Sequence, residues 1–254
     1  MKMYYALVCH NYQHRLCWTL SSIAQQSIFP ANVTVDIACL PNNGNPSNEA
    51  IATYFNNIGL GVRLTYIHDK DIFAKRGLVR NIQIENAIKC DSDYIWFADA
   101  DHVYHPDMFG RLTSWLVQHG KNYHACIFSR AKRHTEVDKT NKLVLESVAE
   151  MPYIDNVFAR ALGIPTIEHI DKSRLAPGNM QVVALQDIID LNNGLYVDPK
   201  HCRDKHMFKK GQKALSDMTF RSLIGRSRAI RLPLQIHLNH VRDKELNTHT
   251  EVQR

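Results

Sequence analysis

The sequence predicts an α/β fold built around a mostly parallel sheet. Short apolar stretches of strand length alternate with longer stretches that repeat apolar residues at helical spacing, which is typical of β-α-β units. The chain has 254 residues, 44% of them apolar, which is enough to bury a sizeable core. No repeat, low-complexity tract or linker interrupts it, so we expect a single domain over 1–254.

The first half of the chain supplies the regular part of this prediction. Its apolar runs predict strands over 4–10, 33–40, 62–68 and 94–98. The stretches between and after them predict helices over 16–26, 49–58, 78–88 and 106–119. Pro106 should stand in the first turn of the last helix, where helix starts favour proline.

The second half is less regular. We expect strands over 124–130, 142–147 and 230–238, a mixture of loop and strand over 171–185, and a helix over 216–224. A polar tail occupies 241–254. In this division, about 1–120 should bind a nucleotide and about 121–240 an acceptor.

Charge and cysteine usage limit the environment and the partners. Lys and Arg number 31 against 25 acids, a net charge of +6, which favours contact with nucleic acid, an anionic lipid surface or a nucleotide. The 6 cysteines include no C-x-x-C pair, so we expect reduced thiols and a cytoplasmic protein. No apolar run approaches the roughly 18 residues of a spanning helix, and no transmembrane or secreted chain is expected.

Two aspartates one residue apart, Asp99 and Asp101, directly follow the apolar stretch 94–98. Neighbouring carboxylates repel each other unless a cation or hydrogen-bond donors meet them. Mg²⁺ and Mn²⁺ bind such oxygens together with substrate phosphates, and open α/β sheets bind ligands beyond the carboxyl ends of their strands. A divalent metal site is therefore one reading of the pair, and a solvated surface turn is the other.

The segment 76–109, with an Arg-Asn helix, a buried strand, Asp-x-Asp and a Pro-Asp helix start, resembles the metal-dependent glycosyltransferases of the GT-A fold, especially the family-2 group. The resemblance extends more weakly from Tyr4 to His240. It implies a Rossmann-like GT-A domain that transfers a sugar from a nucleotide-diphosphate sugar, with UDP the expected nucleotide. It also implies that Asp101 ligates Mn²⁺ or Mg²⁺, while Asp99 contacts the ribose or reaches the metal through water.

The segment 214–240 is similar to the family's Glu-Asp-x-Asp-Phe helix followed by a strand that ends in histidine. Asp217 stands at the position of the catalytic base, which implies inversion at the anomeric carbon. If Asp217 is not the base, a retaining course stays open. Ser216 and Thr219 replace the flanking acids of the motif, and Asp217 could instead be an acid that favours a helix N-terminus.

Two histidines compete for the role of late metal ligand. Strand alternation places His240 on the apolar face of the expected strand and His237 on its polar face, so His240 is the expected ligand. A histidine without a metal role remains the alternative for either. An imidazole ligand would favour Mn²⁺ over Mg²⁺.

The resemblance also assigns a donor pocket. His10 and Tyr12, at the end of the first strand, would contact the nucleotide base. Asn42 or Asn43 stands where the family has an aspartate that reads uracil.

Two arginines are candidates for contact with the diphosphate. These are Arg76 and Arg80, of which Arg80 is the preferred one. Arginines on a solvated helix face are the alternative reading.

The sequence leaves two classes of acceptor open. The family commonly acts on glycans or lipid-linked saccharides, whereas some phage glycosyltransferases modify hydroxymethylated bases in double-stranded DNA. Basic clusters at 130–134, 200–213 and 221–231 could follow DNA phosphates and favour the second class. A non-catalytic relative that only binds nucleotide sugars is a further alternative.

Overall fold

The computed structural model describes residues 1–10, 13–27, 32–41, 47–119, 127–128, 133–134, 168–170, 180–200, 202, 220, 229–231 and 235–237. Within these residues, the first half of the chain forms the regular α/β part.

A mixed sheet in the order β3-β2-β1-β4-β9-β6 forms the centre of the fold. Its first four strands run parallel, whereas β9 pairs with both β4 and β6 in antiparallel orientation. Their bounds are β1 Met3–Cys9, β2 Val33–Cys39, β3 Val62–Tyr66, β4 Tyr94–Asp99, β6 Ile127–Phe128 and β9 Met180–Ala184. The order 3-2-1-4 with parallel pairing is that of a doubly wound nucleotide-binding sheet.

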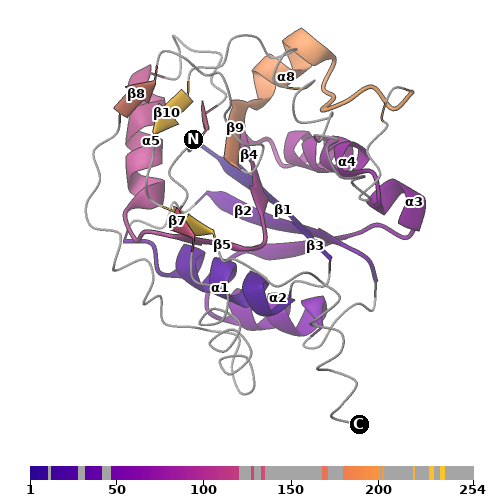
Figure 1. Ribbon diagram of the computed structural model, residues 1–254, viewed down its shortest axis with the longest axis horizontal. Helices are drawn as coiled ribbons and strands as arrows, with labels where there is room; N and C mark the ends of the chain where they lie inside the picture. Colours follow the sequence, from indigo (N-terminus) through magenta and orange to yellow (C-terminus); the bar gives the residue numbers. More distant parts are fainter. Residues whose placement is uncertain are drawn as a thin grey trace.

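Helices cover both faces of this sheet (Figure 1). On one face lie α1 (Gln13–Ala24) and α2 (Asn48–Asn57), and on the other lie α4 (Arg76–Lys89) and α8 (Leu185–Asn192). A short helix, α3 (Lys70–Phe73), precedes α4, and α5 (Met108–His119) follows β4. Among the described residues, three apolar clusters fill the spaces between sheet and helices, as layered α/β packing requires.

Two small sheets accompany the central one. The first has the order β5-β11-β7, with β5 His102–Tyr104, β7 Arg133–His134 and β11 Gln235–His237. The second pairs β8 (Glu168–Ile170) with β10 (Ala229–Arg231). The first of them matters for the site, because β5 begins directly after the turn that holds Asp99 and Asp101.

A buried aromatic cluster supports β5. Tyr5, Trp96, Tyr104 and Phe109 are all fully buried, and their rings lie 4.8–6.1 Å apart. The hydroxyl of Tyr5 donates a hydrogen bond to that of Tyr104. Burial of rings this large is worth several kcal/mol, so β5 is anchored firmly against β1 and β4.

The strands expected in the first half are confirmed, with ends shifted by one or two residues. Helix α4 starts at Arg76, two residues earlier than expected, and α5 starts at Met108, two residues later. Pro106 therefore precedes α5, and its carbonyl oxygen accepts a hydrogen bond from the Ser27 N–H at 2.8 Å. The sequence did not predict α3 or β5.

The expectation of one strand over 230–238 is wrong. This stretch contributes to two strands, β10 and β11, which pair in different sheets. In the sequence Pro233 stands between the two strands, and a proline, which has no N–H for a strand ladder, favours such a division. Of the stretch whose alternation separated His237 from His240, the structure describes only Gln235–His237, so that prediction lies largely outside the described residues.

Parts of the expected second half, including 142–147 and most of 216–224, lie outside the described residues. In the part of the chain that the structure describes, no helix combines the length and apolarity that crossing a bilayer requires.

Candidate active site

The two aspartates lie where the sheet's carboxyl edge turns away from β4. Asp99 is the last residue of β4 and stands in register with Val8 of β1, so it lies next to the carboxyl end of β1. Residues 99–101, called here the acidic turn, lead directly into β5. This is the edge at which doubly wound sheets bind their ligands.

The backbone of the acidic turn is held from both faces of the sheet. From α1, the buried hydroxyl of Thr19 donates to the carbonyl oxygen of Ala100 at 3.0 Å. From α4, the guanidinium of Arg80 donates to the carbonyl oxygen of Ala98 at 2.9 Å. Hydrogen bonds to buried partners of this kind fix the backbone, so the two carboxylates project from a rigid support.

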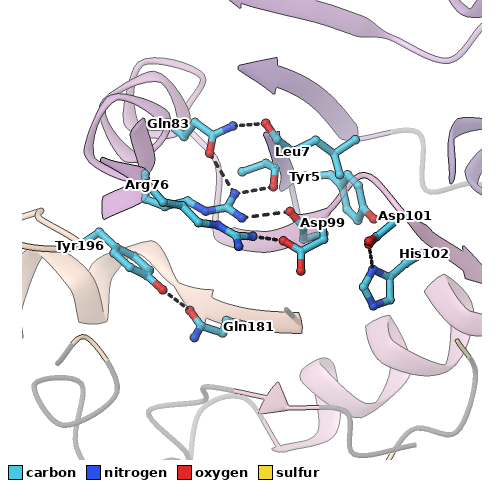
Figure 2. Close-up of polar contacts among 12 residues, drawn as sticks. Tyr5, Leu7, Arg76, Gln83, Asp99, Asp101, His102, Gln181 and Tyr196 are labelled. Carbon is cyan, nitrogen blue, oxygen red and sulfur yellow. Dashed lines mark hydrogen bonds and ion pairs between the residues drawn. The ribbon is translucent and has the colours of Figure 1, made fainter. Parts of the chain in front are cut away.

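Three possible metal ligands converge at this turn (Figure 2). Asp99, Asp101 and His102 each offer one ligand atom, and these atoms lie within 4.8 Å of one another. The Nδ1 atom of His102 lies 2.9 Å from Oδ1 of Asp101, and the imidazole is fully buried. Carboxylate oxygens combined with an imidazole nitrogen suit a divalent ion such as Mn²⁺, so the residues present fit a metal.

His102 is a residue that sequence reasoning missed. It directly follows Asp101, but the expected elements placed no strand there, so nothing indicated the direction of its side chain. In the structure β5 starts at His102, which turns the imidazole inward beside Asp101. The run Asp-Ala-Asp-His was the available signal.

Arg76, the first residue of α4, forms an ion pair with Asp99 (Figure 2). Both side chains are partly exposed, 30% for the arginine and 24% for the aspartate. The predicted diphosphate partner Arg76 thus lies beside the acidic turn. A partly solvated guanidinium in this place can also reach a ligand beyond the sheet edge.

Arg80, by contrast, is 2% exposed and bonds to the protein itself. Besides the carbonyl of Ala98, its guanidinium contacts the carbonyl of Ala6 at 2.8 Å and Oε1 of Gln83 at 3.0 Å. It also lies over the ring of Phe97, 5.1 Å from the centroid. This burial gives no support to direct diphosphate contact, and Arg80 instead joins β1, β4 and α4 beneath the acidic turn.

The network continues from Arg80 into β2. Gln83 donates to the carbonyl of Leu7 at 2.7 Å and to Oδ2 of Asp36 at 3.2 Å, while Thr65 donates to Oδ1 of Asp36 at 2.6 Å. Burial raises the pKa of the fully buried Asp36 carboxyl, and the hydrogen bonds from Thr65 and Gln83 oppose that rise. A buried polar chain therefore links β2, α4 and the acidic turn.

The remaining residues that the sequence predicts for the site, which would bind the nucleotide sugar, the metal or the acceptor's proton, fall into two groups. His10 lies just after β1, exposed, with its ring 5.4 Å from that of Phe73 in α3. It therefore shares the sheet edge with Asp99 and Arg76. The other candidates lie outside the described residues: Tyr12, Asn42, Asn43, Asp217 and His240.

Phe220 is the one described residue of the stretch 216–224, and it belongs to the core. It is fully buried, and its ring stacks on Tyr196 at 4.1 Å and meets Phe97 of β4 at 5.8 Å. Phe220 is the phenylalanine of the motif that resembles the family's Asp-Phe helix, three residues after Asp217. Asp99 lies two residues along β4 from Phe97, so Phe220 itself packs near the acidic turn.

His237 has a described backbone, and its position bears on the late ligand. In β11 it pairs with His102 of β5 on one side and with His134 of β7 on the other. The backbone of His237 thus lies in register with His102, one of the three possible metal ligands.

Comparison with known proteins agrees with this geometry. The family described as "Glycosyltransferase like family 2" matches residues 2–143, more than half of the chain. No curated protein sequence matches.

Solved structures match over nearly the whole chain. TarS from S. aureus superposes with a TM-score of 0.61 at 11% identity, over 94% of this chain and 37% of TarS. TarS 1–349 in complex with UDP-GlcNAc gives 0.59 at 11% identity, over 94% and 59%. The mannosyltransferase PcManGT from Pyrobaculum calidifontis, in complex with GDP-Man and Mn²⁺, gives 0.55 at 14% identity, over 98% and 59%.

The chain spans less than two thirds of the length of these structures. At such identities they establish a shared fold, the GT-A fold of glycosyltransferases. Together with the family match over residues 2–143, they show that the chain belongs to the family-2-like glycosyltransferases.

Proposed function

We propose that the chain transfers a sugar from a nucleotide-diphosphate sugar to an acceptor hydroxyl in a metal-dependent reaction. The observation that carries the proposal is the convergence of Asp99, Asp101 and His102 on one point at the carboxyl edge of the sheet, beside Arg76. In a glycosyltransferase fold, that edge is where the donor's diphosphate would lie.

We propose a separate role for each residue at and around the acidic turn. Asp101 and His102 would hold the divalent ion, with Asp99 as a third ligand or a ribose contact. The ion would offset the negative charge that develops on the departing nucleoside diphosphate. Arg76 would bind the diphosphate from the other side, because its guanidinium matches phosphate geometry. Arg80 would position the acidic turn rather than contact the donor.

The transfer also needs a catalytic base, and we propose Asp217 for this role. Its carboxylate would accept the acceptor hydroxyl's proton as that oxygen attacks the anomeric carbon from the side opposite the leaving group, which inverts the configuration. The contacts of Phe220 with Tyr196 and Phe97 support this proposal, because Phe220 follows Asp217 by three residues in the sequence.

The late histidine ligand is proposed to be His240, with His237 as the competing candidate. The register of His237 with His102 supports an approach of this part of the chain to the cluster. His10 and Tyr12 would hold the base, and Asn42 would read it. TarS with UDP and PcManGT with GDP-Man show that the fold accepts either nucleotide, and we propose UDP for this chain.

For the acceptor we propose a hydroxymethylated base in double-stranded DNA, on the ground of the basic clusters in the sequence. A glycan or lipid-linked saccharide is the competing outcome. Binding to DNA should weaken steeply between about 50 and 200 mM salt, by a factor of roughly 10³ or more if at least six phosphates are contacted. A short soluble saccharide would show no such slope.

Thermal denaturation with nucleotide sugars, with and without Mn²⁺, tests the donor site. A donor at about 100 times its dissociation constant should add about 2.7 kcal/mol of stability, which appears as a higher melting temperature. We expect a Mn²⁺-dependent rise with UDP-sugars that Asp101→Asn abolishes. The matched control is Asp190→Asn, which removes an exposed carboxylate on α8, away from the acidic turn.

Sugar transfer or donor hydrolysis tests the chemistry. Asp217→Asn should remove turnover while the Mn²⁺-dependent thermal shift remains, because a base acts after the donor has bound. A chain that shows no metal-linked shift with any UDP- or GDP-sugar would contradict the donor site. Binding without turnover for every acceptor would support the non-catalytic alternative.

A further inference from the structure

We propose that Arg76 makes the binding of the divalent ion and the binding of the donor's diphosphate depend on each other. Arg76 occupies the carboxylate of Asp99 until a diphosphate takes over the guanidinium and leaves that carboxylate to the ion. This inference rests on the proposed function, because it assumes that the acidic turn holds the ion.

The ion pair itself is the first support. Arg76 Nη2 contacts Asp99 Oδ1 directly, and Asp99 is a member of the cluster that could hold a metal. An ion that binds to Asp99 must therefore displace a protein cation or share the carboxylate with it. Displacement costs the ion pair, and sharing brings two cations within a few ångströms of each other.

The freedom of the two side chains is the second support. The backbone on both sides of Asp99 is fixed, since Arg80 holds the carbonyl of Ala98 and Thr19 that of Ala100. Helix α4 is held as well, because the side chain of Asn81 bonds to the backbone of residues 196 and 197. The exchange therefore needs only rotation of two partly exposed side chains.

The two aspartates differ in this respect. Asp101 lies against the fully buried imidazole of His102, which could itself ligate the ion. Asp99 lies against a permanently charged guanidinium, which cannot be a ligand. The neighbour of Asp101 is thus a group that could bind the same ion, whereas the neighbour of Asp99 is a cation that the ion must displace or tolerate.

A diphosphate is a suitable group to move Arg76. Guanidinium binds phosphate through two parallel hydrogen bonds, so the exchange replaces one carboxylate contact with a stronger one. Coupling of this kind is reciprocal. If the nucleotide raises the affinity of the chain for Mn²⁺ by some factor, Mn²⁺ must raise the affinity of the chain for the nucleotide by the same factor.

The experiment measures the dissociation constant of Mn²⁺ by isothermal titration calorimetry, without nucleotide and with saturating UDP, corrected for the Mn²⁺ that UDP binds in solution. In Arg76→Met we expect Mn²⁺ alone to bind about fivefold more tightly than in the unmodified chain, the upper end for a partly exposed ion pair. With UDP bound, this gain should vanish.

Lys75→Met is the matched control, because it removes the same charge one residue away. It should change the Mn²⁺ constant by less than about twofold, the effect of a solvated charge at longer range. Arg76→Lys keeps the charge and loses the planar fork, so its constants should lie between those of Arg76→Met and the unmodified chain. In an Asp99→Asn background, Arg76→Met and Lys75→Met should behave alike, because no ion pair remains to be lost.

The inference is overturned if Arg76→Met binds Mn²⁺ alone no more tightly than Lys75→Met does while Mn²⁺ and UDP still bind together, which would leave the proposed function intact. If neither Mn²⁺ nor UDP binds to the unmodified chain, the proposed function fails, and the inference fails with it. Melting curves of all variants establish that each is folded at the temperature of the titration.

Discussion

Asn81, the asparagine of the Arg-Asn helix motif, joins α4 to the segment that carries Tyr196. Its Oδ1 accepts from the backbone N–H groups of Tyr196 at 2.7 Å and Val197 at 3.1 Å, and its Nδ2 donates to the Val197 carbonyl at 2.8 Å. Tyr196 and Val197 are 1% and 4% exposed. Replacement of Asn81 by alanine removes an acceptor from two buried donors.

The expected loss follows from these contacts. A buried N–H that loses its partner costs about 1–3 kcal/mol, so two of them cost about 2–6 kcal/mol. Alanine is the better helix former by about 0.5 kcal/mol and returns that amount. We therefore expect Asn81→Ala to lower the free energy of unfolding by about 2–5 kcal/mol. Asn81→Asp keeps an acceptor for both N–H groups, but its second oxygen faces the Val197 carbonyl in place of Nδ2. We therefore compare it at acid pH, where the protonated carboxyl can donate to that carbonyl, and expect a smaller loss than for Asn81→Ala.

Urea denaturation followed by circular dichroism measures both variants against the unmodified chain. Because Tyr196, whose backbone Asn81 holds, stacks its ring on Phe220, the near-ultraviolet signal should change in Asn81→Ala and less in Asn81→Asp. A loss below about 0.5 kcal/mol for Asn81→Ala would refute the reasoning. Equal losses for the two variants would refute it too, because the acceptor would then not be the source of the effect.

Three other changes have expected outcomes. Arg80→Met should lower the free energy of unfolding by about 2–3 kcal/mol in urea denaturation, because Oε1 of the buried Gln83 loses its hydrogen-bond donor. The Mn²⁺-linked thermal shift should also weaken. A thermal shift of unchanged size would contradict the positioning role of Arg80. Burial raises the pKa of Cys17 to about 12, so iodoacetamide at pH 8 should modify the half-exposed Cys90 before Cys17. Peptide mass spectrometry measures both rates of modification, and equal rates for Cys17 and Cys90 would contradict the burial of Cys17. Burial lowers the pKa of His105 from 6.5 in the folded state. The contribution of His105 to the free energy of unfolding should therefore be complete above pH 6.5 and be lost as the pH falls through the folded-state pKa. His105→Gln should flatten the pH dependence of the free energy of unfolding, and an unchanged pH dependence would contradict this prediction.

The regular half of the fold could be predicted from the sequence because its signals are local. Apolar runs such as 94–98 and the helical repeats between them depend on residues within one element, and the parallel order follows from the alternation. Prediction failed where tertiary contacts decide, as at β5 and at the division of 230–238. A three-residue strand has no periodicity to detect, and it exists because Tyr104 packs against Tyr5 and Trp96.

The candidate site divides in the same way. By itself, the sequence determined that two carboxylates end a buried strand and that the chain resembles metal-dependent glycosyltransferases, because motif and spacing are local properties. Only the tertiary structure decided which arginine is buried and which meets Asp99, since both stand on one helix and differ only in what packs around them. It also added His102 to the cluster, because its direction depends on how β5 packs and not on its neighbours in the chain.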